Sequence, residues 1–163
     1  MNRTKINYDG KDLLIISHLR ADSRSKLTSM SRDTRIPVST IFDKIRLFKS
    51  SGLIRKNTSI VSFERFGYAT KAMVFLSALK EERAKLSELL QSSPSVNSLF
   101  RINSGWDFVA EVIFPGFREI EDFLEKVEEK VMLKDKKVFY VVEELKREEF
   151  MANPKYLAMT TRQ

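Results

Sequence analysis

The hydrophobic pattern of the chain changes its period near residue 63, and this change limits the available folds most strongly. Before Phe63, apolar residues such as Ile41, Ile45 and Phe48 recur at the three- and four-residue spacings of amphipathic helices. After Phe63, runs of strand-forming residues alternate with helical stretches. The pattern therefore predicts a small helical domain followed by an α+β domain.

The first part of the sequence predicts three short helices. The first begins near Asp9, and the second covers about residues 25–34. The third begins at Pro37, whose fixed φ suits the first turn of a helix, and ends at Gly52. A basic, β-like run from Leu53 to Phe63 follows. This order predicts a winged or extended helix-turn-helix.

The third predicted helix has hydroxyl residues in its first turn and long cations one and two turns later. This composition suits a helix whose N-terminal end enters a DNA major groove. Ser39 and Thr40 are expected at phosphates or base edges, Lys44 at phosphates, and Arg46 at a guanine or the backbone.

Other residues around this helix are expected to contact DNA in different ways. Asp43 orients an arginine or accepts from a cytosine amine, while Phe42 packs on a thymine methyl or on the first helix. Basic residues outside the helix are expected to contact phosphates irrespective of sequence. The predicted DNA-contacting residues are Arg35, Val38, Ser39, Thr40, Phe42, Asp43, Lys44, Arg46, Arg55 and Lys56.

The distribution of charge supports a polyanion partner for the first part of the chain. The net charge is +7, with 13 Lys and Arg against 5 Asp and Glu up to Phe63, and 16 against 17 beyond it. All of the excess positive charge therefore lies in the predicted helical domain, as expected for a double-stranded DNA-binding module.

The second part of the sequence predicts a β-α-β-β-α-β order, which is the ferredoxin-like arrangement with both helices on one face of an antiparallel sheet. Because the strands look apolar on both faces, the uncovered face predicts a homodimer. The expected domains are 1–63, 64–147 and a C-terminal tail of 148–163. The expected strands are 68–79, 96–102, 108–114 and 138–143, with helices at 80–92 and 117–131.

The sequence offers little for catalysis or for cofactors. It has no cysteine and one histidine, His18, and we find no phosphate-binding loop or nucleophile–base set. No apolar run is long enough to span a membrane, and the first residues are polar rather than typical of a signal peptide. We therefore expect a cytoplasmic protein that is not an enzyme and needs no cofactor.

Several short motifs, taken in their order and spacing, resemble the leucine-responsive regulator/AsnC (Lrp/AsnC, or feast/famine) family of transcription regulators. The resemblance covers about residues 8–146. It rests on Asp12, Leu14-Ile15, Asp22-x-Arg24, Ser39-Thr40-Ile41, Ile45-Arg46, Gly52-Leu53-Ile54, Gly67-Tyr68 and Trp106-Asp107.

The resemblance implies a helix-turn-helix joined to a ferredoxin-like ligand-sensing domain, with dimers that assemble up to octamers on nucleoid DNA. It also implies an amino-acid effector near a turn made by Asn103, Ser104, Gly105, Trp106 and Asp107. Pro37 and Ser104-Gly105 depart from the family's usual residues, so DNA reading is better supported than ligand sensing. Trp106 also suits a core or interface position.

Two other functions remain open from the sequence. One is an architectural protein that coats DNA without a narrow target. The other is suggested by relatives of the family, the sirohaem decarboxylases, which use His and Arg of the second domain on a tetrapyrrole. This chain has no histidine after His18, and Arg101 and Arg118 are the only well-placed arginines there.

Overall fold

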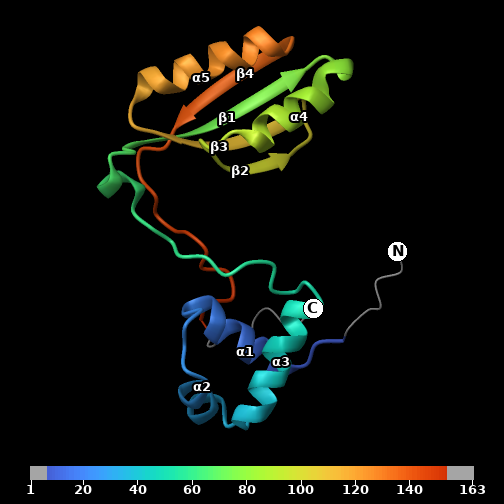
Figure 1. Ribbon diagram of the computed structural model, residues 1–163, viewed down its shortest axis with the longest axis vertical. Coiled ribbons are helices and arrows are strands. Elements are labelled where there is room, and N and C mark those ends of the chain that lie inside the picture. The colour runs from blue at the N-terminus through green and yellow to red at the C-terminus, as the bar shows by residue number, and fades with distance from the viewer. Residues whose placement is uncertain (1–6, 154–163) are drawn as a thin grey trace. The chain divides into compact units, whose positions relative to one another are not determined.

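A computed structural model describes residues 7–153, which divide into two compact units (Figure 1). The first unit contains residues 7–59 together with 145–153, and the second contains Ile60–Glu144. Most of the predicted C-terminal tail, residues 154–163, lies outside the described residues.

Three helices form the first unit: α1 (Gly10–Ala21), α2 (Leu27–Thr34) and α3 (Val38–Ser50). α1 begins with a capping box, in which the carboxylates of Asp9 and Asp12 each accept the other's backbone N–H at 2.8 Å. The helices pack around a small apolar core, as a helix-turn-helix requires. Its buried residues are Ile15, Met30, Ile36, Ile41 and Phe48.

The start of α3 lies one residue later than predicted. Pro37 is the N-cap residue, with an extended ψ of 142°, rather than the first residue of the helix. Its carbonyl accepts the first intrahelical bond, from the Ile41 N–H at 3.0 Å. The helix therefore starts without a side-chain cap.

The prediction of a β-like wing after α3 is wrong. α3 ends at Ser50, Gly52 takes a left-handed φ of 76°, and residues 53–62 form no strand. A strand needs a hydrogen-bonded neighbour, and no segment of the described chain pairs with these residues. β-like composition alone did not make a wing here.

The second unit is a four-stranded antiparallel sheet in the order β2-β3-β1-β4 (Figure 1). Its two α-helices cover one face, as the ferredoxin-like expectation required. Residues from both helices and from the sheet share one buried core. The elements are η1 (Phe63–Phe66), β1 (Thr70–Ala78), η2 (Lys80–Glu82), α4 (Arg83–Ser92), β2 (Val96–Arg101), β3 (Phe108–Phe114), α5 (Phe117–Lys130) and β4 (Leu133–Tyr140).

The last strand begins five residues earlier than predicted. β4 covers Leu133–Tyr140, whereas the sequence favoured 138–143. The cause is the charged run of residues 134–137, which hides the strand pattern. Such residues are tolerated because β4 lies at an edge of the sheet, where lysines are common.

The sheet face turned away from the helices is apolar around a polar centre. Met73, Phe75, Val109 and Ile113 alternate with core residues and so point to this face. Its centre holds Glu111, only 5% exposed. The Glu111 carboxylate accepts from the Asn97 amide at 2.6 Å and the Ser98 hydroxyl at 2.9 Å, and it lies 3.9 Å from the Lys71 ammonium.

Candidate nucleic-acid interface and ligand cavity

α3 presents a polar, accessible face because its apolar stripe is used by the core. Ile41 and Phe48 are fully buried, while Ser39, Asp43 and Arg46 are exposed. Residues three and four apart lie on the same side of a helix, so these three side chains form one continuous row. The row is long enough to contact several neighbouring groups of a ligand.

Large apolar side chains lie exposed beside that row. Phe42 is 54% exposed, Val38 39% and Leu47 46%. Of the two interpretations left open for Phe42, this exposure favours contact with a ligand over packing against α1. Its ring is free to contact a ligand. Exposed aromatic side chains on an otherwise polar helix are typical of binding surfaces.

Lys44 differs from the other cations of α3 because it is paired within the fold. Its ammonium lies 2.5 Å from Asp12 and 3.7 Å from Asp9. The hydrogen bond to Asp12 raises the pKa of Lys44, and the Asp12 backbone N–H lowers the pKa of Asp9. This charge therefore holds α3 against the start of α1, which argues against the phosphate contact expected from the sequence.

The remaining cations expected at DNA are exposed. Arg35 ends α2 in a left-handed conformation with a φ of 60°, and its side chain lies on the surface. Arg55 and Lys56 lie in the extended segment after α3 and are also exposed. Thr40 is half-buried at the first turn of α3. The structure thus keeps most of the predicted DNA-contacting residues accessible on the basic unit.

The turn between β2 and β3 contains the five residues expected to hold an effector. Ser104 and Gly105 both take left-handed φ values, 63° and 94°, which makes the turn tight. Together with Asn103 they are exposed. Trp106 instead packs its ring against Phe75, with ring centroids 5.8 Å apart.

Asp107 ends this turn and ties it to two other elements. Its side chain is almost buried, and its Oδ1 lies 2.8 Å from the Arg83 Nε of α4. Its Oδ2 accepts the Ala78 backbone N–H of β1 at 3.0 Å. Both carboxylate oxygens are therefore engaged inside the unit, so Asp107 positions the turn.

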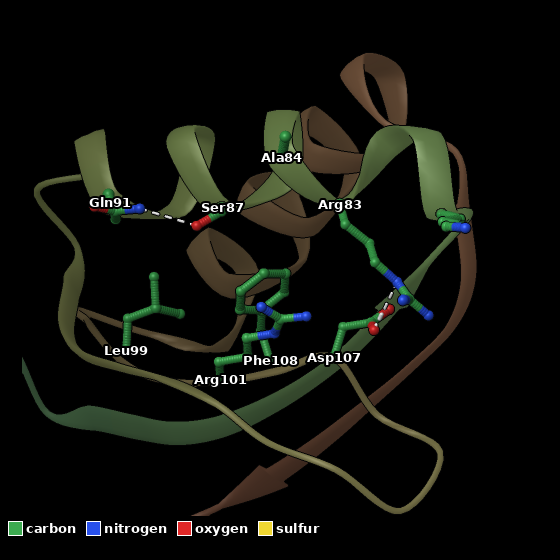
Figure 2. A pocket seen from close by; sticks show the side chains of 9 residues that line it. Arg83, Ala84, Ser87, Gln91, Leu99, Arg101, Asp107 and Phe108 are labelled. Atoms are coloured by element: carbon green, nitrogen blue, oxygen red, sulfur yellow. Dashed lines mark hydrogen bonds and ion pairs between the residues drawn. The ribbon is translucent and has the colours of Figure 1, made fainter.

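A cavity of about 670 Å³ lies between α4 and the β2–β3 edge of the sheet (Figure 2). Of the five residues predicted for the effector, only Asp107 lines it. The signal in the sequence is the spacing of Arg83, Ser87 and Gln91, which lie four residues apart on one face of α4. The lining residues are Lys80, Arg83, Ala84, Ser87, Gln91, Leu99, Arg101, Asp107 and Phe108.

The described residues show neither a membrane-spanning helix nor a metal site. No helix among residues 7–153 is long and apolar enough to cross a membrane. In the same part of the chain, no group of His, Asp and Glu side chains has the arrangement of a metal site.

Comparisons with known proteins agree on one family. No family model matches the chain. The transcriptional regulator FL11 of Pyrococcus abyssi is 26% identical over 123 residues, covering 76% of this chain and 82% of the relative. The regulator LrpC of Bacillus subtilis is 22% identical over 121 residues, covering 74% and 84%. Both relatives carry names of helix-turn-helix transcriptional regulators, not of enzymes, which confirms the expectation of a non-enzymatic protein.

Solved structures confirm the fold. The regulator NMB0573 of Neisseria meningitidis, in complex with L-Met, aligns with a TM-score of 0.81 at 18% identity, covering 86% of this chain and 94% of that one. The LrpC structure of B. subtilis aligns with a TM-score of 0.79 at 19% identity, covering 86% and 99%. The helix-turn-helix, the ferredoxin-like sheet and these relatives agree, so the chain is similar in sequence and in fold to helix-turn-helix transcription regulators of the Lrp/AsnC family.

Proposed function

We propose that the protein is a homodimeric, sequence-specific transcription regulator that places α3 in the DNA major groove. The observation that carries the proposal is the exposed row Ser39, Asp43 and Arg46 on a unit that holds the excess positive charge of the chain. In a helix-turn-helix, the second helix of the motif reads base edges mainly with its N-terminal residues. The protein would act on nucleoid DNA in the cytoplasm.

Each exposed residue of α3 is assigned a distinct contact. Ser39 and Thr40 donate to phosphates or base edges, and Val38 adds apolar contact at the same end of the helix. Arg46 binds a guanine or the backbone, and Asp43 accepts from a cytosine amine or orients an arginine. Phe42, exposed at 54%, packs on a thymine methyl.

Residues outside α3 supply contacts that do not depend on sequence. Arg35, Arg55 and Lys56 are exposed and are assigned to phosphates. Lys44 is assigned to the packing of α3 on α1, because Asp12 compensates its charge. This division separates the residues that set specificity from those that set affinity.

Dimerisation is assigned to the sheet face that carries Met73, Phe75, Val109 and Ile113. A second copy of the chain would cover these apolar residues, and two-fold symmetry would make the operator a pseudo-palindrome. The two half-sites should lie about 10 bp apart, or a multiple of that distance. Further assembly of dimers, up to octamers, would extend the protected region of DNA.

An effector is assigned to the region of the turn 103–107. The named complex of a structural neighbour with L-Met supports a small ligand such as an amino acid. Binding there would change the assembly of dimers and thereby the affinity for DNA, which is a coupling between two sites.

The proposal is tested by selecting genomic fragments and measuring their affinity in gel shifts over a range of salt concentrations. Arg46→Ala should weaken binding to the selected site by about tenfold to a hundredfold and relax the preference at one base pair. Arg118→Ala removes the same charge from an exposed position of α5 and is the matched control. Log K should fall by about 0.9 per phosphate contact against log salt.

The second candidate is an architectural protein that coats DNA, which is favoured by the exposed cations Arg35, Arg55 and Lys56. Competition with nonspecific DNA separates the two functions. A selected fragment that resists a large excess of nonspecific competitor supports the regulator. Equal competition by all fragments contradicts sequence specificity and supports coating.

A further inference from the structure

The cavity between α4 and the β2–β3 edge has a net positive lining (Figure 2). Three cationic side chains, Lys80, Arg83 and Arg101, line it beside one carboxylate, Asp107. The cavity volume of about 670 Å³ falls within the usual range for small-molecule sites. A positive, open cavity of this size favours a small anion.

Asp107 does not compensate all three cations. Its Oδ1 lies 2.8 Å from the Arg83 Nε, and its Oδ2 accepts the Ala78 N–H at 3.0 Å. Asp107 thus neutralises the charge of Arg83. Arg101 and Lys80 are exposed and contribute the remaining positive charge. The planar guanidinium of Arg101 suits a carboxylate, which it can bind through two parallel hydrogen bonds.

The other residues of the lining indicate what the rest of the ligand is like. Leu99 and Phe108 are apolar, and Figure 2 shows Arg101 beside the Phe108 ring. At the other end of α4, the Gln91 amide donates to the Ser87 hydroxyl at 2.9 Å, so both groups can also contact a polar atom of a ligand. A short apolar chain next to a carboxylate fits this arrangement.

The lining disfavours an ammonium group. Within the described lining, the acceptors are an occupied carboxylate and the neutral oxygens of Ser87 and Gln91. An ammonium there would face the charges of Lys80, Arg83 and Arg101 without a free carboxylate partner, which costs free energy. An amino acid is therefore a poorer ligand than the same skeleton without its ammonium.

We propose that this cavity binds a small organic acid without an ammonium group. The site is separate from the exposed turn residues Asn103–Gly105, but it touches the turn through Asp107. A carboxylate that attracts the Arg83 guanidinium weakens its pair with Asp107 and so shifts the turn. This consequence for assembly rests on the proposed function, whereas binding itself does not.

The test is calorimetric titration of the full chain with 4-methyl-2-oxopentanoate and with leucine, which share a carbon skeleton. The oxo acid should bind, and Arg101→Ala should weaken its binding by about tenfold or more, because a charge-assisted hydrogen bond is lost. Lys80→Ala should also weaken the binding of the oxo acid. Arg118→Ala, on α5 of the same unit, should leave it unchanged.

Melting curves test whether the variants remain folded. They should, because Arg101 and Lys80 are exposed. The proposal is overturned if neither substitution changes the affinity for the oxo acid. It is also overturned if leucine binds as tightly as the oxo acid and its binding is equally sensitive to Arg101→Ala. No binding of the oxo acid up to about 10 mM, a free energy near −3 kcal/mol, also overturns it. Gel shifts that still show sequence preference would then leave the proposed function standing.

Discussion

Lys44 illustrates, at the scale of one residue, how pairing inside the fold changes the role of a cation. The sequence places it among the phosphate-binding residues of a basic helix. In the structure its side chain is 23% exposed, and its ammonium is held by Asp12 of α1. Because the Asp12 side chain is 8% exposed, the pair is partly desolvated and both partners depend on it. Pairs between distant segments are not visible in a local pattern.

Replacing Lys44 by Met should destabilise the first unit by about 1–3 kcal/mol at neutral pH, since Asp12 loses its counter-charge. The hydrogen bond to Asp12 raises the pKa of Lys44 above its ordinary 10.5, so this stabilisation is complete below pH 10.5 and is lost as the pH rises through the raised value. The wild type should therefore lose stability in alkali more steeply than the variant. Urea unfolding followed by helical circular dichroism over pH measures this difference.

In acid, the same experiment should show stability falling as the pH falls. The Asp12 backbone N–H lowers the pKa of Asp9 below its ordinary 3.8, so its contribution is present above pH 3.8 and is lost as the pH falls. This loss of stability in acid should persist in Lys44→Met, because the backbone contact remains. Lys49→Met, at an exposed position of α3, is the control. Identical alkaline profiles for wild type and Lys44→Met would contradict the pairing argument.

At the scale of elements, the sequence predicted what depends on local periodicity. The bounds of β3, Phe108–Phe114, and the apolar stripe of α3 follow from the alternation and the helical spacing of their own residues. The wing and the start of β4 were wrong because pairing and edge position are decided by neighbouring strands. The cavity was missed for the same reason, since only the fold of the second unit places Arg83 and Arg101 in the lining of one cavity.

The C-terminal segment of the first unit is tied to α1 by the side chain of Arg20. Arg20, in the last turn of α1, donates to the Glu148 carboxylate at 2.8 Å, the Glu148 carbonyl at 2.7 Å and the Phe150 carbonyl at 3.1 Å. Two carbonyls and a carboxylate are thus held by a single guanidinium fork. Residues 148–150 should detach when that fork is removed.

Arg20→Ala should increase amide hydrogen exchange across residues 145–153 while costing only about 1 kcal/mol of unfolding free energy, because the contacts are exposed. Arg20→Lys should give nearly the same result, since an ammonium cannot span three acceptors with this geometry. Arg24→Ala is the matched control, because there only the backbone N–H is engaged, by Asp22. Unchanged exchange in Arg20→Ala would show that other contacts hold the segment.

At the scale of the whole molecule, the proposed dimerisation depends on the sheet face that the helices leave uncovered. Phe139 is 48% exposed there and packs against Phe75, with ring centroids 5.5 Å apart. Buried Glu111 and its partners Lys71, Asn97 and Ser98 form a polar group at this face, around which a second copy must align. Apolar area supplies the affinity between copies, and polar groups favour one alignment.

Phe139→Glu should therefore prevent the proposed dimerisation and leave monomers, because a charge placed in an apolar interface loses its hydration without gaining a partner. Sedimentation measures the change in mass, and Met132→Glu, at a residue 66% exposed beyond α5, is the control that should remain dimeric. The consequence for DNA follows from linkage: two α3 helices on one dimer bind the second half-site at a high effective concentration. The monomer should lose about a hundredfold in affinity for the full operator, yet bind an isolated half-site as the wild type does. Equal loss on the half-site would instead mean that the substitution damages the helix-turn-helix itself, and a dimeric Phe139→Glu would assign dimerisation to another surface.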